Sequence, residues 1–158
     1  MTKKIAIVLL GFLISGIVFG CGKKKPDGMP KLVPCEVSVI QDGKPLEGAV
    51  VSFYSDTIKW SISGTTDANG LAKIHTHGTY PGSPEGEFKV TVTKTVIEQT
   101  TQPEPVSASV TVSPSPSYDS VDSQYKMRNS TPLTITVSGK TTQSFDVGAA
   151  VRDEIKPL

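Results

Sequence analysis

Two histidines with one residue between them, His75 and His77, are the first group in this chain whose types and spacing could do chemistry. Side chains two apart on a β-strand point to the same face, so the two imidazoles would lie side by side. Zinc sites use this spacing but need at least one further protein ligand. Glu85 and Glu87 are near in sequence, but nothing in the pattern fixes them beside the histidines. We expect solvent-facing histidines at a strand end, with a metal site at His75 and His77 as the alternative.

The segment 67–70, Asp-Ala-Asn-Gly, begins like a calcium-binding loop and then departs from it. Leu71 stands where the loop needs its next oxygen ligand, and no glutamate follows at the required distance. A turn that uses Asn-Gly chemistry accounts for these residues. No serine lies in a nucleophile-elbow pattern, and no glycine loop has the spacing that cradles phosphate. The sequence predicts a protein that is not an enzyme and uses no cofactor.

A third reactive candidate, Cys21, follows a segment with the order of a secretory leader. Lys3 and Lys4 form a short positive region, and residues 5–20 contain no charge. That run is short for a spanning helix, which needs about 20 residues. We expect residues 1–20 to be a signal peptide. An uncleaved membrane anchor, or an ordinary leader with an incidental cysteine, is the alternative.

The end of this leader, Ile-Val-Phe-Gly-Cys at 17–21, resembles a lipobox. A small residue directly precedes Cys21 and an aliphatic residue lies three positions before it, although Phe19 is bulkier than the usual occupant. The resemblance implies that Cys21 becomes the first mature residue and carries a diacylglyceryl group and a further acyl chain, such as palmitate. Several acyl chains hold durably, whereas one chain, at about 0.8 kcal/mol per buried methylene, holds only marginally.

We therefore expect a lipoprotein anchored in the cell membrane or the outer membrane, facing the periplasm or the exterior. In such lipoproteins an aspartate after the cysteine commonly retains the protein at the inner membrane. Gly22 stands there, which favours the outer membrane if the cell has one.

Residues 21–32 are polar and rich in turn formers, which predicts a lipidated tether. The lysines at 23–25 would either add roughly 1 kcal/mol each of attraction to anionic headgroups or only keep the tether solvated. The whole chain has 16 basic and 15 acidic residues, and loss of Lys3 and Lys4 with the leader leaves 14 and 15, a net charge of −1. This balance argues against nucleic acid as a partner, which requires a clustered basic surface.

These candidates must be positioned by short strands, because the rest of the chain alternates apolar and polar residues between turn formers. Aromatic residues are 6% of the chain and Gly, Pro, Ser and Thr are plentiful, which disfavours long helices. We expect an all-β domain over residues 33–148, a seven-stranded antiparallel Greek-key β-sandwich, with 149–158 as a C-terminal tail. The expected strands cover 35–40, 48–54, 60–66, 71–76, 87–93, 133–137 and 145–147.

Cys35 begins the first of these strands and alternates with Val37 and Val39 on its inward face. We expect a buried free thiol that behaves as a small hydrophobe rather than a nucleophile or ligand. If Cys21 is acylated, Cys35 has no partner for a disulfide.

The regular pattern breaks over about 95–130, where four prolines lie among many Ser and Thr residues. This stretch is far longer than a usual connection of about 4 to 6 residues, so we expect a disordered or functional insertion. Residues 106–112 do alternate and could form an extra strand or edge hairpin within it.

Three motifs carry a family resemblance: DGKPLEGAVVSF at 42–53, TDANG at 66–70 and PEGEFKVTV at 84–92. Together they resemble the carboxypeptidase regulatory-like domain, a prealbumin-like (transthyretin-like) sandwich. Tyr125 and Lys126, followed by residues 130–137, are similar to the closing strands of bacterial lipoproteins built on that domain. The resemblance implies a non-catalytic accessory, surface or binding module. Cys35 departs from the extended polar or glycine-containing first strand that is more usual there.

Two classes of function remain. The first is an accessory or structural module of the cell envelope that contacts other proteins. The alternative is a lipoprotein that binds carbohydrate or another small ligand. Its candidate stacking platforms are Trp60, Tyr54, Tyr80, Tyr118 and Tyr125, of which Trp60 and Tyr80 lie beside turns and are the two expected to be exposed. If Trp60 and Tyr80 lie together on one face, beside polar groups, the binding function gains support. If both rings are packed inside, it loses most of its support.

A remote alternative is a transthyretin-like hydrolase acting on hydroxyisourate, which shares the sandwich. That family ends in a Tyr-Arg-Gly-Ser tail. This sequence ends Glu154-Ile155-Lys156-Pro157-Leu158 and has no histidine near its expected mature start, so the resemblance does not extend to that activity.

Overall fold

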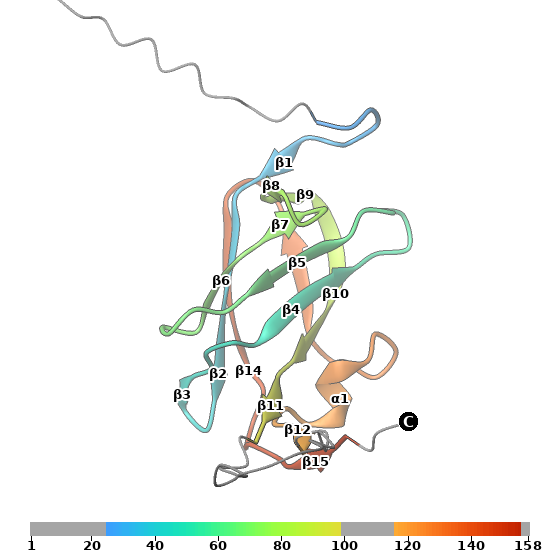
Figure 1. Cartoon of the computed structure of the whole chain (residues 1–158). Helices are drawn as coiled ribbons and strands as arrows, with labels where there is room; N and C mark the ends of the chain where they lie inside the picture. The colour runs from blue at the N-terminus through green and yellow to red at the C-terminus, as the bar shows by residue number, and fades with distance from the viewer. Residues whose placement is uncertain (1–24, 99–115, 156–158) are drawn as a thin grey trace, which may run out of the picture.

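The computed structural model describes residues 25–98 and 116–155, which form a mostly β structure with one short helix (Figure 1). The expected signal peptide at 1–20, Cys21 and the alternating stretch at 106–112 lie outside the described residues. Among the residues described, no helix is long and apolar enough to cross a membrane.

The largest sheet has six strands, and every neighbouring pair in it is antiparallel. Its order is β13 (Thr134–Val137), β10 (Gly86–Thr93), β4 (Val50–Tyr54), β5 (Ile62–Thr65), β7 (His75–Thr76) and β8 (Tyr80–Pro81). Alternation decides which side chains face inward: Val51 and Phe53 of β4 are buried, whereas Val50 and Tyr54 are exposed. The inner rings of Phe53 and Phe88 lie 5.5 Å apart between centroids.

A second sheet is built around β2 (Cys35–Gln41), which pairs with β14 (Thr141–Asp146), β3 (Lys44–Pro45) and β6 (Leu71–Lys73). The pair of β2 and β14 is parallel, so the expectation of a wholly antiparallel fold is wrong at this point. The reason is that the turn at Gly139 does not close a hairpin. β13 pairs with β10 in the first sheet, whereas β14 pairs with β2 in the second.

The expected strand at 71–76 divides at Ile74 and contributes to both sheets. β6 pairs with β2, and β7 pairs with β5. The side chain of Ile74 is buried at this junction, and its N–H donates to the carbonyl oxygen of Cys35 at 3.0 Å. One continuous apolar pattern in the sequence therefore corresponds to two short strands.

One buried cluster receives side chains from both sheets. It includes Cys35, which is 3% exposed and confirms the prediction of a buried free thiol. The cluster consists of Val33, Cys35, Val37, Val39, Leu46, Ala49, Val51, Phe53, Ile62, Ala72, Ile74, Phe88, Val90, Val92, Val121, Ile135, Val137, Phe145 and Val147.

Two smaller sheets lie at opposite ends of the molecule (Figure 1). At one end β1 (Leu32–Val33) pairs with β9 (Ser83–Pro84), so the last residue of the expected tether belongs to a strand. At the other end β11 (Thr95–Ile97), β12 (Ser117–Asp119) and β15 (Asp153–Glu154) form an antiparallel sheet beside α1 (Ser123–Lys126). The described residues near both ends of the expected insertion, and part of the expected tail, therefore lie in strands or in the helix.

Candidate functional site

The two histidines do not share a strand face, contrary to the prediction. β7 ends at Thr76, and His77 has a left-handed backbone with φ 53°, which breaks the alternation. The ring nitrogen Nδ1 of His75 lies 3.0 Å from the carbonyl oxygen of Lys73, whereas the ring of His77 packs edge-on against Trp60, with centroids 5.9 Å apart. In the part of the chain that the structure describes, no three or more His, Cys, Asp or Glu residues gather closely enough to hold a metal ion.

Trp60 and Tyr80 are both partly buried, which matches neither expected outcome. Trp60, in the loop between β4 and β5, lines a hollow of about 360 Å³ together with Gly28 and Pro30 of the N-terminal segment, and a second hollow of about 390 Å³. Tyr80 belongs to β8, opposite Thr76, and lines neither hollow. The predicted stacking pair is therefore not assembled at Trp60.

The thiol of Cys35 is a buried member of the core. Its burial, with a smaller contribution from the charge of Glu36, raises the pKa of Cys35 from 9.0 to about 11. Since the thiolate is the nucleophile and the metal ligand, the structure favours the structural role predicted for this residue.

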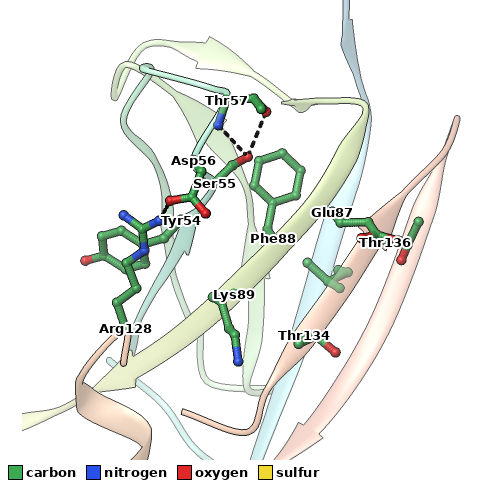
Figure 2. A pocket seen from close by; sticks show the side chains of 11 residues that line it. Tyr54, Ser55, Asp56, Thr57, Glu87, Phe88, Lys89, Arg128, Thr134 and Thr136 are labelled. Carbon is green, nitrogen blue, oxygen red and sulfur yellow. Dashed lines mark hydrogen bonds and ion pairs between the residues drawn. The ribbon is translucent and has the colours of Figure 1, made fainter. Parts of the chain in front are cut away.

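A larger hollow, of about 580 Å³, lies at β4, β10 and β13, and sequence reasoning did not identify it (Figure 2). We call it the Tyr54 hollow. Its lining combines one exposed aromatic ring, four charged side chains and several hydroxyl groups. The lining residues are Tyr54, Ser55, Asp56, Thr57, Glu87, Phe88, Lys89, Arg128, Thr134, Ile135 and Thr136.

The floor of the Tyr54 hollow is set by the register of β10 and β13. Lys89 pairs opposite Thr134, and Glu87 pairs opposite Thr136. All four residues are exposed, because they alternate with the buried residues Phe88 and Ile135 of the same strands. The sequence pattern predicts that these side chains point outward, but it does not predict the two walls that enclose them.

One wall is the loop that follows β4. The hydroxyl of Ser55 lies 3.1 Å from the hydroxyl of Thr57 and accepts the N–H of Thr57 at 3.4 Å, which closes a local turn. This turn places Asp56 between them with an exposed side chain, next to Tyr54 at the end of the strand. Tyr54 itself is 40% exposed.

The other wall is the segment between α1 and β13, which a buried threonine fastens to β10. The hydroxyl of Thr131 donates to the carbonyl oxygen of Val90 at 2.6 Å and accepts the N–H of Leu133 at 3.2 Å. Lys89 donates its ammonium to the carbonyl oxygen of Thr131 at 3.4 Å. These bonds hold the segment in place, and Arg128 extends from it to form an ion pair with Asp56 across the hollow (Figure 2).

The charges in the lining of the Tyr54 hollow are balanced, since it contains two carboxylates, Asp56 and Glu87, and two cations, Lys89 and Arg128. The ion pair between Arg128 and Asp56 is exposed, and exposed pairs contribute little to stability, typically about 0 to 1 kcal/mol. The arrangement can therefore offer both donors and acceptors to a bound molecule while carrying no net charge of its own.

Comparisons with known proteins do not identify a family. No protein-family model matches the chain, and a search of curated proteins finds no match. Among solved structures, the chain is similar to a 9R-lipoxygenase from Cyanothece PCC8801 with a TM-score of 0.31 and 17% sequence identity. The match covers 80% of this chain and 18% of the lipoxygenase, so the chain spans less than a fifth of that protein's length. A likeness of this size supports no conclusion about fold or function.

Proposed function

We propose that this chain is a lipid-anchored, non-catalytic interaction module of the cell envelope. The leader at 1–20 and the lipobox-like sequence before Cys21 support the anchor. The ten residues at 22–31 would join the anchored cysteine to the folded body. At about 3.5 Å per extended residue, such a tether spans at most roughly 35 Å, so the body would stay close to the bilayer.

The observation that carries this proposal is the place where the tether enters the body. The N-terminal segment leads into β1 at one end of the molecule, whereas α1 and the sheet of β11, β12 and β15 lie at the opposite end (Figure 1). A body tethered in this way turns that opposite end away from the lipid. Partners in the envelope would then meet this end and the flank that carries the Tyr54 hollow.

We further infer that the body is a prealbumin-like sandwich of the carboxypeptidase regulatory-like kind. Support comes from the single buried cluster that takes side chains from both major sheets, and from the overlap of all seven expected segments with observed strands. The proposed sandwich therefore includes one parallel pair, β2 with β14, among its antiparallel strands. A shared fold would not by itself assign a function.

The anchor can be tested by expressing the full chain in bacteria with a clickable palmitate analogue and measuring label and membrane partition. The wild type should incorporate the analogue and enter the detergent phase. Cys21→Ala should do neither, because it removes the acylated thiol. Cys35→Ala is the matched control, since it removes the other thiol and should leave labelling intact. Label retained by Cys21→Ala, or absent from the wild type, contradicts the proposal.

A second candidate function, the binding of carbohydrate or another small ligand, is favoured by the Tyr54 hollow. Its volume of about 580 Å³ falls within the range of small-molecule sites, roughly 300 to 1,000 Å³. Such sites combine aromatic side chains with a few fixed polar groups, as this lining does. In this proposal the stacking platform is Tyr54, one of the five aromatic candidates in the sequence, rather than Trp60 or Tyr80.

A further inference from the structure

We propose that the Tyr54 hollow is a binding site for a neutral oligosaccharide. This inference deepens the second candidate function and rests on it, but it does not depend on acylation of Cys21. Three features of the hollow support it: the balance of charge, the exposed aromatic ring and the bonds that hold the polar groups in place.

The charge balance selects against ionic ligands. An anion approaching Arg128 would also meet the carboxylate of Asp56, and a cation approaching Asp56 would also meet the guanidinium of Arg128, because the two form an ion pair. Glu87 and Lys89 add one further charge of each sign to the same lining. Like-charge contacts of this kind are how a site rejects the wrong ligand. A ligand rich in hydroxyl groups has no such penalty, because each hydroxyl can both donate to a carboxylate and accept from a guanidinium or ammonium.

Tyr54 supplies the surface on which a sugar ring can pack. Its ring is 40% exposed at the end of β4 and lines the hollow beside Asp56 and Arg128. Tyrosine offers a large apolar face with a polar tip, which suits a ligand that has both C–H faces and hydroxyl edges. A tyrosine has only two side-chain torsions to fix, so the entropy lost on binding is small.

The polar groups are held before any ligand arrives. Thr131 is 2% exposed and fastens the Arg128 segment to β10 through its bond to the carbonyl oxygen of Val90. On the facing wall, the bonds between Ser55 and Thr57 shape the turn that carries Asp56. The ion pair of Arg128 with Asp56 joins the two walls. Wall segments fixed in this way lower the ordering cost of binding.

The test is isothermal titration of the full chain, purified in a detergent without a sugar headgroup, with neutral trisaccharides. The probes are cellotriose, maltotriose, laminaritriose, mannotriose and chitotriose. At least one should bind, and Tyr54→Ala should weaken it tenfold or more, whereas Tyr54→Phe should retain binding because the ring remains. Trp60→Ala is the matched aromatic control outside the hollow and should bind like the wild type.

Several results would overturn this assignment. They are no binding of any neutral trisaccharide, equal binding by Tyr54→Ala, loss of binding in Trp60→Ala, or tighter binding of inorganic phosphate or trigalacturonate at the same residues. If Tyr54→Ala does not fold, Thr136→Arg provides the second variant. It places a large side chain on the exposed floor of the hollow and should abolish binding without touching the core. A failed titration leaves the palmitate result unaffected, so failure of the sugar site and failure of the anchor are distinguishable.

Discussion

At the scale of single residues, burial determines what Cys35 can do. The thiol lies in the core beside Val37 and Val39 of its own strand, and the cost of burying a charge there raises its pKa to about 11. The alternation of β2 predicts this inward position directly. The partners of buried hydroxyls are not predictable in the same way, since Thr131 bonds to the carbonyl of a residue 41 positions away.

The raised pKa of Cys35 predicts a loss of stability in base. The folded state keeps the thiol protonated between pH 9.0 and about 11, whereas the unfolded chain releases the proton from about pH 9.0 upward. The contribution is therefore fully present below pH 9.0 and is lost as the pH rises through about 11. In urea unfolding from pH 8 to 11, the free energy of unfolding should fall more steeply with pH for the wild type than for Cys35→Ala. Equal slopes of this free energy against pH for the two proteins would contradict the raised pKa of Cys35.

At the scale of elements, the strands that alternate strictly are predictable and the short ones are not. Residues 87–93 are expected as a strand, and β10 covers them. β14 begins at Thr141, earlier than the expected strand at 145–147. The prediction misses this start because the first four residues of β14 are polar and give no apolar signal. The sheet of β11, β12 and β15 is absent from the prediction. Its strands are two or three residues long, too short for a periodic pattern to be recognised.

Lys126 ties this small sheet to α1. Its ammonium lies 3.0 Å from a carboxylate oxygen of Asp119 in β12 and 3.2 Å from one of Asp153 in β15. Burial lowers the pKa of Lys126, but hydrogen bonds and charge from the two carboxylates outweigh this and leave the pKa raised. The pair with Asp119 is mostly shielded from solvent, which favours a measurable contribution.

We expect Lys126→Met to loosen the β15 end of the chain, because it leaves Asp119 and Asp153 facing each other without a cation. Hydrogen exchange should accelerate in residues 151–155, by about fivefold to tenfold for a local loss of roughly 1 kcal/mol. Lys140→Met, on an exposed turn, is the control and should leave exchange there unchanged. If both variants exchange alike, the ion pairs do not hold β15.

At the scale of the whole molecule, local and long-range features differ in what the sequence reveals. The proposed leader and the lipobox-like sequence are runs of adjacent residues, so they can be proposed without a structure. The Tyr54 hollow cannot, since its walls meet through Arg128 and Asp56, which are 72 positions apart. The same limit explains the histidines: His75 and His77 are two apart in sequence, but the turn at His77 separates the surroundings of their rings.

Lipid anchoring of this chain requires that Cys21 is the acylated first residue of the mature protein. The most direct measurement is the intact mass of the full-length gene product purified from bacterial membranes, followed by fragmentation of its N-terminal peptide. We expect a chain that begins at Cys21, with a diacylglyceryl group on the sulfur and an acyl chain on the nitrogen. An unmodified Cys21, or a mature N-terminus at another residue, would contradict it.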